Sequence, residues 1–299
     1  MSNFLMIILC LVGGVVLSKL KSFPKNAHIG INAFIFYVSL PALSLRYIPN
    51  IDYRYEILFP AAMPWIIFIL SALLFLVLGK IFNWHKHLVG CLILCCGLSN
   101  TSFVGFPLLQ LFYGDEALKY GILADQPGSF MVMATLGIFT TIYFQQGKGS
   151  FKPVAKKIIK FPPFIAFLLA LCLTFVDVPS SLNHVFETLG ATLSPLALFS
   201  IGTQLTWQTK NFEFLPFSIG LMYKLFLAPL VIYLVYSLLA NPQELIIKVS
   251  IVEAAMAPMI TGVLLAIEYK LRPNLASMFA TVGIPLSLLT TWLWYLFLG

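Results

Sequence analysis

The amino-acid sequence predicts an all-α, polytopic membrane protein with ten transmembrane helices, arranged as two inverted five-helix repeats with spans 4 and 9 broken and crossed. The composition is the first reason, because 60% of the 299 residues are hydrophobic and 10% are charged, whereas soluble domains average about 45–50% and about 25%. The second reason is that apolar, nearly charge-free runs, most of them long enough to cross a bilayer, recur along the whole chain. The third is that two of these runs are interrupted by Gly and Pro at corresponding places in the two halves.

This composition excludes several classes of protein. A secreted disulfide scaffold, a disordered chain and a nucleic-acid binder would all be more polar, and a cytosolic enzyme needs a water-compatible surface. The five cysteines lie in apolar runs, and their odd number fits no disulfide framework. The four histidines lie in predicted loops and form neither a His-Glu-x-x-His motif nor a Cys–His pair. We therefore expect no metal site, no cofactor and no nucleic-acid partner.

Charged turns, most of which contain Pro, separate the runs and justify each span in order. Span 1 is followed, not preceded, by Lys19, Lys21 and Lys25, which distinguishes a retained helix from a cleaved secretory signal. The turns that end the successive spans are 19–28, 49–56, 80–87, 114–119, 145–160, 177–183, 207–213, 240–244 and 268–274. The spans themselves are 1–18, 29–48, 57–79, 88–113, 120–144, 161–176, 184–206, 214–239, 245–267 and 275–298.

The distribution of Lys and Arg predicts the orientation. With ten spans, one side of the membrane receives thirteen of the 18 basic residues and the opposite side receives four, Arg46, Arg54, Lys119 and Lys248. The basic-rich side is cytoplasmic by the positive-inside rule. We expect a multi-pass protein of the cell membrane with both termini extracytoplasmic. The thirteen residues are Lys19, Lys21, Lys25, Lys80, Lys86, Lys148, Lys152, Lys156, Lys157, Lys160, Lys210, Lys270 and Arg272.

An internal repeat relates residues 1–149, with spans 1–5, to residues 150–299, with spans 6–10. An odd number of spans per half inverts one half relative to the other. Three landmarks recur at nearly one offset of 154 or 156 residues, which supports the repeat: Pro41 with Pro195, Pro60 with Pro216, and Tyr113 with Tyr269.

Polar interruptions in spans 4 and 9 are the candidate binding region. In hydrocarbon a helix break is tolerated only where it lines protein or water, and corresponding broken helices in two halves point to the binding site of a membrane transporter. Half-helix N-termini at such a crossing attract an anion. The candidate substrate-binding residues in span 4 are Asn100, Thr101, Ser102, Gly105 and Pro107, and those in span 9 are Met256, Pro258 and Thr261.

Three ionisable residues lie within spans, where such residues are expensive and usually functional. Lys224 falls near the middle of span 8, Glu253 just before the break in span 9, and Asp125 early in span 5. Lys224 either forms a structural ion pair with Glu253 or Asp125, or serves as a counter-charge for an anion or as a substitute for a coupling cation. Gly14 and Gly202, with Gly13, are expected to allow close helix packing.

The span 4 motif resembles the signature of the auxin efflux carrier family, which includes plant PIN carriers and bacterial malate and malonate permeases. Other stretches agree over nearly the whole chain, with one departure: Ala257 separates Met256 from Pro258, where the family has Pro directly after Ala-Met. The short central loop is typical of a prokaryotic member, so a bacterial inner membrane is expected. The matching stretches are Asn100-Thr101-x-x-x-Gly105-x-Pro107, Pro41-Ala-Leu, Ser-Pro195 to Leu205, Lys224 to Pro229, and Ala254 to Met256 with Glu268-Tyr269.

The resemblance implies a fold like that of bile-acid transporters and sodium–proton exchangers. Spans 1, 2, 6 and 7 would form a scaffold, also the homodimer interface, and spans 3–5 and 8–10 a domain that moves by an elevator mechanism. It also implies that Asn100 and Gln126 contact the substrate, with Ser39 across the domain interface. The expected function is a permease or efflux carrier for small organic anions such as malate, malonate or an auxin-like carboxylate.

Other functions fit the sequence less well. An intramembrane enzyme needs a nucleophile with a base or paired aspartates, which the spans lack. A channel predicts a continuous polar stripe, whereas only local polar breaks occur, and a sensor normally carries a soluble domain. A bile-acid-type symporter driven by Na⁺ or H⁺ stays an alternative, because Glu253 could carry a proton but no carboxylate cluster for sodium is evident.

Overall fold

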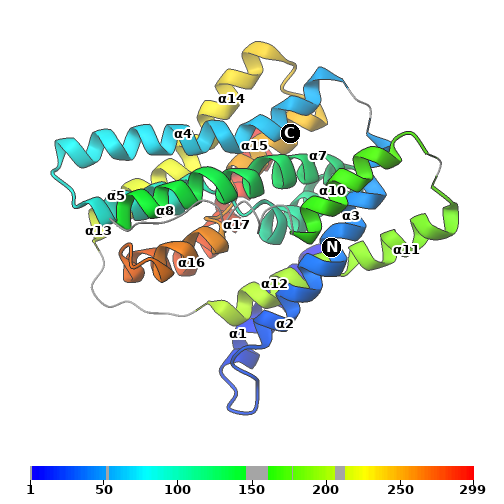
Figure 1. The fold of residues 1–299 in the computed structure, drawn as a ribbon, viewed down its shortest axis with the longest axis horizontal. Helices are drawn as coiled ribbons and strands as arrows, with labels where there is room; N and C mark the ends of the chain where they lie inside the picture. Colours follow the sequence, from blue (N-terminus) through cyan, green and yellow to red (C-terminus); the bar gives the residue numbers. More distant parts are fainter. Residues whose placement is uncertain (1, 52–53, 146–160, 177, 206–212) are drawn as a thin grey trace. The chain divides into compact units, whose positions relative to one another are not determined.

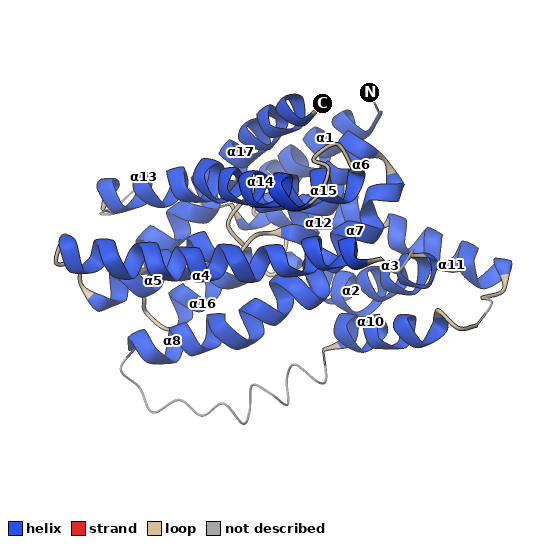
Figure 2. Ribbon diagram, turned by 90° about the horizontal axis from the view of Figure 1, so that it is seen from above, coloured by secondary structure: helices blue, strands red, loops and turns tan. Residues whose placement is uncertain are grey.

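The structure is a computed structural model, and it describes residues 2–51, 54–145, 161–176, 178–205 and 213–299. Throughout these ranges the chain forms helices and connecting turns, without a named strand (Figure 2). The helical architecture expected from the composition is therefore confirmed. The lysine-rich stretch from Lys148 to Lys160 and Lys210 lie outside the described residues.

The helices follow the predicted spans closely. In several places one apolar run is divided by a π-helical turn, such as Tyr223–Leu227 in span 8. The α-helices are α1 (Ser2–Ser18), α2 (Ala27–Phe34), α3 (Leu40–Tyr47), α4 (Leu58–Ile81), α5 (Lys86–Gly97), α6 (Phe106–Tyr113), α7 (Leu118–Leu123), α8 (Ile138–Gln145), α10 (Pro162–Leu173), α11 (Ser180–Ala191), α12 (Leu193–Gln204), α13 (Phe214–Met222), α14 (Ala228–Leu239), α15 (Leu245–Ala254), α16 (Ile260–Glu268) and α17 (Pro273–Leu298).

Six helical segments within the described ranges are long and apolar enough to cross a membrane: Ala27–Asn50, Tyr55–Ile81, Asp115–Gln145, Ser180–Gln204, Phe214–Leu239 and Pro273–Leu298. Shorter apolar helices occupy Phe4–Ser18, Lys86–Gly97, Thr101–Tyr113 and Pro162–Leu173. These lengths support a polytopic membrane protein. The expectation that the histidines lie in loops was wrong for His28 and His87, because α2 and α5 begin earlier than predicted. His184, the first residue of predicted span 7, lies in the second turn of α11.

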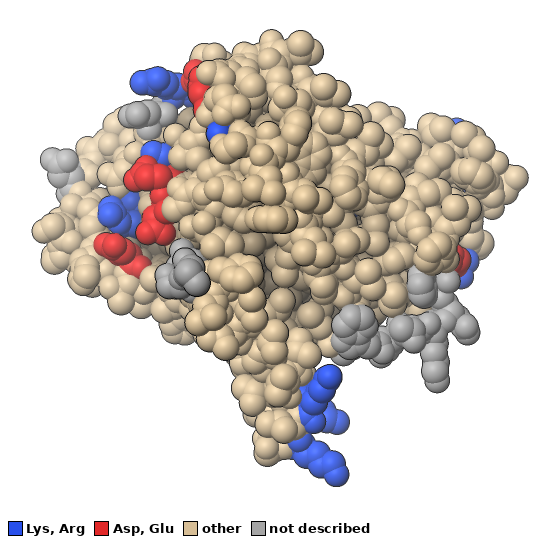
Figure 3. All heavy atoms as spheres, turned by 180° about the vertical axis from the view of Figure 1, so that it is seen from behind, with Lys and Arg blue, Asp and Glu red and all other residues tan. Residues whose placement is uncertain are grey.

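The surface is apolar in the way that a lipid environment requires. Large hydrophobic side chains such as Phe175 and Leu238 are 90% and 87% exposed, and many others in α1, α4 and α17 are exposed as well. On the face drawn in Figure 3 the charged side chains gather in small groups, and a broad area between them carries none. Soluble monomers rarely expose apolar surface of this extent.

The chain divides into two compact units, which are interleaved along the sequence. Unit 1 consists of Met1–Arg54, Ser102–Ile122 and Lys152–Leu205, and unit 2 of Tyr55–Thr101, Leu123–Phe151 and Thr206–Gly299. Each unit takes helices from both halves of the sequence. Figure 1 shows this mixing by colour: within unit 2, cyan α4 and green α8 both pack against α5, and orange α16 also contacts α5.

In unit 1 helices α1 and α12 lie in close contact at Gly14 and Gly202. A Cβ atom on Gly14 would lie 2.3 Å from the carbonyl oxygen of Phe199 and 3.0 Å from the Cα of Gly202. A Cβ on Gly202 would lie 2.3 Å from the carbonyl oxygen of Leu11. Small residues let helix backbones meet in this way in membranes. The packing role expected for Gly14 and Gly202 is confirmed, whereas a Cβ on Gly13 would meet nothing within 4 Å.

Gly14→Ala should therefore lower the thermal stability of unit 1, because the obstacle is backbone that cannot rotate away. Overpacking of this kind costs about 1–3 kcal/mol. The adjacent Gly13→Ala is the matched control and should leave the melting temperature unchanged or slightly higher, since Ala is the better helix former. The melting temperature of the two detergent-purified variants checks this. Equal destabilisation by both changes would contradict the assigned helix contact.

In unit 2 helix α4 is the centre of the packing and contacts α5, α14 and α15. Its buried side chains include Met63, Ile67 and Phe75. Two tyrosine hydroxyls from span 8 donate to carbonyl oxygens of this helix: Tyr223 to Ile67 at 2.6 Å and Tyr236 to Phe59 at 2.7 Å. These bonds fix span 8, and with it Lys224, against α4.

Candidate functional site

The interrupted spans 4 and 9 pair with each other in unit 2. Helix α5 ends at Gly97, and Leu98 then adopts an extended conformation with φ −109° and ψ 126°. The amide of Asn100 donates to the carbonyl oxygen of Ala257 at 2.9 Å, and the amide of Met259 donates to the carbonyl oxygen of Leu98 at 3.0 Å. These bonds form an antiparallel bridge between Ser99 and Pro258. Backbone groups released by each break thus satisfy those of the other, as burial in a membrane demands.

Local sequence explains both the breaks and their close approach. Pro258 has no amide hydrogen and disfavours helical geometry in the residue before it, so it cannot continue α15. A Cβ on Gly262 would lie 2.8 Å from the Leu98 side chain and 3.3 Å from the carbonyl oxygen of Leu94. Glycine at position 262 therefore permits α16 to lie against the end of α5.

Helix ends of both signs collect at this crossing. Helices α5 and α15 end there, which directs their last carbonyl oxygens toward it. The helical turn Thr101–Gly105 begins directly after Asn100, and α16 begins at Ile260, directly after Met259. Their first amides have no partner within the helix and carry partial positive charge. Such N-termini bind anions, and such C-termini bind cations.

Asn100 places a free hydrogen-bond donor at the crossing. The residue is 3% exposed, and its amide nitrogen Nδ2 has no hydrogen-bond partner among the described residues. A buried donor without an acceptor costs about 1–3 kcal/mol. An anionic ligand would supply the missing acceptor.

A second polar cluster joins Thr101 to span 5. The Thr101 hydroxyl donates to Oδ1 of Asp125 at 2.6 Å, and Nε2 of Gln126 donates to Oδ2 of the same carboxylate at 3.0 Å. Asp125 and Gln126 are both buried in the π-helical segment Ala124–Phe130. π-Helical turns are frequent at functional sites. Oε1 of Gln126 is left without a partner in the described structure.

Lys224 is completely buried, with 0% of its surface exposed. Its ammonium group donates to the Ser99 hydroxyl at 2.5 Å and to the carbonyl oxygen of Ala254 at 3.0 Å. Span 8 therefore ties the turn after α5 to the C-terminal end of α15. Within the described ranges the ammonium group makes no hydrogen bond to Glu253, whose two carboxylate oxygens have no partner there.

Glu253 is as fully buried as Lys224. The surroundings of its carboxyl group differ from those of the Asp125 carboxyl group. Neither carboxylate oxygen of Glu253 has a hydrogen-bond partner in the part of the chain that the structure describes. Asp125, by contrast, accepts bonds on both oxygens. The charged groups that act on Glu253 are Asp125 and Lys224. The site thus holds two carboxyl groups in very different environments.

The other candidate residues are divided between the two units. Met256 and Pro258 are buried at the crossing in unit 2, and Thr261 is half-buried in the first turn of α16. Ser39, Ser102, Gly105 and Pro107 belong to unit 1. There the Ser39 hydroxyl forms a 2.8 Å hydrogen bond with the Thr192 hydroxyl.

Sequence reasoning missed several groups of the site. Ser99 is the main one, since no property of the sequence distinguishes it from Ser102 as the partner of Lys224. The carbonyl oxygens of Ala254 and Ala257 could not be found either, because any residue supplies the same atom. Ser129, whose buried hydroxyl has no partner among the described residues, could have been found, because it follows Asp125 by one helical turn.

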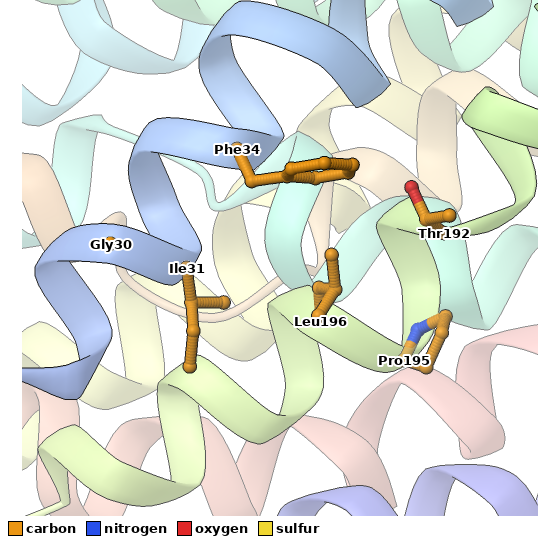
Figure 4. Close-up of a pocket in the computed structure, with 6 residues that line it drawn as sticks. All are labelled: Gly30, Ile31, Phe34, Thr192, Pro195 and Leu196. Atoms are coloured by element: carbon orange, nitrogen blue, oxygen red, sulfur yellow. The ribbon is translucent and has the colours of Figure 1, made fainter.

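Unit 1 contains an apolar cavity of a different kind, with a volume of about 540 Å³. Figure 4 shows side chains of α2 and α12, with Thr192, around it. Apart from the Thr192 hydroxyl, the six lining residues present no polar side chain, so the cavity has no group that recognises charge. They are Gly30, Ile31, Phe34, Thr192, Pro195 and Leu196.

Comparisons with known proteins identify the family of this chain. The profile of the family described as membrane transport protein (Mem_trans), the auxin efflux carrier family, matches residues 1–295. An uncharacterized transporter of Methanocaldococcus jannaschii is 29% identical over 304 residues, which cover 98% of this chain and 97% of the relative. An uncharacterized transporter of Methanothermobacter thermautotrophicus is 28% identical over 211 residues, 68% of this chain and 66% of the relative. The chain therefore belongs to the auxin efflux carrier family of membrane transport proteins, and it is a transporter and not an enzyme.

Proposed function

We propose that this protein is a secondary transporter of small organic anions, with a substrate carboxylate bound at the crossing of spans 4 and 9. One observation carries this proposal: the side-chain amide of Asn100, which has no hydrogen-bond partner among the described residues, lies where two helices begin. All three groups donate hydrogen bonds, so the ligand that satisfies them is an acceptor with negative charge. Lys224, Asp125 and Gln126 surround the crossing as counter-charge and further polar contacts.

Malate, malonate and auxin-like monocarboxylates are the candidate substrates. Malonate and malate are small enough to fit a site built on backbone and short side chains, and both carry carboxylates. Oε1 of Gln126, which has no partner in the described part of the chain, is an acceptor that suits a substrate hydroxyl or a protonated carboxyl. This feature favours malate over a substrate without a donor.

We propose ten transmembrane spans in two inverted halves and an elevator-type motion of a transport domain past a scaffold. Antiparallel pairing of Ser99 with Pro258 supports the inverted repeat, since equivalent breaks of two inverted halves would meet in this way. The two compact units support the two-domain scheme, because spans 1, 2, 6 and 7 belong to unit 1 and spans 3, 8, 9 and 10 belong to unit 2. Residues 102–122 depart from the scheme, since they belong to unit 1. A homodimer through the scaffold, insertion in the cell membrane and extracytoplasmic termini complete the scheme.

Glu253 is the proposed carrier of a coupling proton. A buried carboxylate without a donor is unstable and neutralises by taking up a proton, whereas the donors on Asp125 stabilise its charge. Binding of an anion beside Asp125 and Glu253 is also more favourable when Glu253 is neutral. Lys224 and Asp125 are the charged groups that act on this residue.

Glu253→Gln should abolish the effect of a pH gradient on uptake while exchange of labelled for unlabelled substrate continues. Glutamine mimics the protonated acid but cannot release a proton. Uptake into proteoliposomes with and without an imposed pH gradient checks this. Glu268→Gln, an exposed position at the end of α16, is the control. Gradient-driven uptake by Glu253→Gln would remove Glu253 from the coupling step.

A thermal-shift screen of the detergent-purified protein against small organic acids tests the anion site. A ligand that binds only the folded state raises the melting temperature, by an amount that corresponds to about 2.7 kcal/mol at 100 times its Kd. We expect one class of mono- or dicarboxylates to stabilise the protein. If no small organic acid does so, the proposed substrate class is wrong.

A further inference from the structure

We propose that the ammonium group of Lys224 fills a monovalent cation site, so that this transporter works without Na⁺, and that removal of the side chain opens this site to Na⁺. The part played in coupling rests on the proposed transport function. The capacity to bind a cation does not, and it can be measured without any substrate.

The ligands of Lys224 are those of a cation site. Both acceptors are oxygens, the Ser99 hydroxyl at 2.5 Å and the Ala254 carbonyl at 3.0 Å. Ala254 is the last residue of α15, so its carbonyl carries the partial negative charge of a helix C-terminus. In transporters with discontinuous helices, unwound carbonyls and half-helix C-termini coordinate the coupling Na⁺ or H⁺.

In its deprotonated state Glu253 adds the negative charge that a cation site needs. It precedes Ala254 in α15, is fully buried, and has two oxygens without a hydrogen-bond partner in the described ranges. Its charge and that of Lys224 act on each other. The Ser99 hydroxyl and the Ala254 carbonyl oxygen are hard oxygen ligands, which suit an alkali ion once the ammonium group is gone. The Glu253 carboxylate, which makes no hydrogen bond to Lys224 in the described ranges, supplies the balancing charge.

The surrounding structure holds Lys224 in this position. The π-helical turn Tyr223–Leu227 is fixed on one side by the bond from the Tyr223 hydroxyl to the Ile67 carbonyl oxygen at 2.6 Å. On the other side Nε1 of Trp294 donates to the carbonyl oxygen of Leu225 at 3.1 Å. The ammonium group is covalently attached to the protein and held at a fixed point, so it takes the place of an ion that would otherwise have to bind and dissociate.

The test compares the melting temperatures of purified variants in choline chloride, KCl and NaCl at equal ionic strength. For Lys224→Ala we expect Na⁺ to raise the melting temperature by about 3–5 °C over choline at saturation. The wild type should show no such difference. Lys224→Met, whose side chain fills the same volume with apolar atoms, should not respond, and Lys86→Ala, at an exposed position, reports the general effect of salt.

Further variants decide the other outcomes. Lys224→Ala/Glu253→Gln should lose most of the cation response, because the carboxylate is gone. If Lys224→Ala does not fold, Lys224→Ser, which adds a hydroxyl ligand, takes its place; purification of either only when Na⁺ or K⁺ is present would support the site. A folded Lys224→Ala that ignores both ions, an equal response in Lys224→Met, or a requirement of the wild type for Na⁺ would each overturn the inference.

Discussion

Lys224→Met should yield a folded protein whose transport activity falls at least tenfold. The substitution removes a buried charge, whose insertion alone costs about 2.5–3.5 kcal/mol at the centre of a membrane helix, so folding does not suffer from desolvation. Transport activity falls because, at the crossing, the Ser99 hydroxyl and the Ala254 carbonyl oxygen lose their common hydrogen-bond donor. A hydrogen bond to a charged group is worth about 1.5–3 kcal/mol, which corresponds to roughly 10- to 100-fold.

The double variant Lys224→Met/Glu253→Gln separates this role from simple charge balance. If Lys224 served only to neutralise Glu253, the removal of both charges would restore transport, as for a buried ion pair replaced by apolar atoms. Because Lys224 binds Ser99 and Ala254, we expect the double variant to fold and remain inactive. Uptake by proteoliposomes that contain equal amounts of protein is the measurement, with Lys86→Met as the control. Recovery of transport in the double variant would make the lysine a packing device.

Asn100→Ala should weaken binding of the anionic substrate by roughly 10- to 100-fold without unfolding the protein. The crossing itself is closed by the backbone amide of Asn100, which alanine also provides. The substitution removes the side-chain amide, whose Nδ2 donor has no partner among the described residues, and a bond from this donor to a carboxylate is worth about 1.5–3 kcal/mol. The substrate concentration at half-maximal thermal shift reports the affinity.

Ser250→Ala is the matched control for Asn100→Ala. Ser250 is also buried in unit 2, but its hydroxyl bonds within α15, to the Ile246 carbonyl oxygen at 2.7 Å. The substrate affinity of Ser250→Ala should stay within about twofold of the wild type, because a hydroxyl that bonds within its own helix is not expected to contact the ligand. An Asn100→Ala variant that is well folded and binds with unchanged affinity would exclude Asn100 from the site.

Most of the fold could be predicted from the sequence because the bilayer imposes simple rules. Apolar runs with charged ends mark helices by length, and the ends of α13 to α17 agree with the predicted runs within a few residues. The breaks after Gly97 and before Pro258 were also predictable, because Gly, Pro and polar residues occur together in otherwise apolar spans. The short helices α2 and α3 were not separated, since the intervening π-helical turn leaves no signal in composition.

The site was less predictable, for two physical reasons. Several of its groups are backbone atoms, such as the carbonyls of Ala254 and Ala257, whose positions depend on conformation and not on residue type. The other reason is that the sequence is compatible with several partners for one buried charged group. Lys224 could have reached Glu253 or Asp125 on the evidence of the sequence, and only the geometry of span 8 directs it to Ser99.

The most direct test of an anion site at the crossing is uptake of radiolabelled malonate and malate by proteoliposomes, with the uncharged diamide malonamide as the comparison. The two classes of compound have nearly the same shape, so the difference in uptake reports recognition of the carboxylate. We expect saturable uptake of at least one acid, inhibition by other small organic acids, and no uptake of the diamide above protein-free vesicles. Uptake of neither acid by the folded wild-type protein, or equal uptake of the diamide, would contradict a carboxylate site between the broken helices.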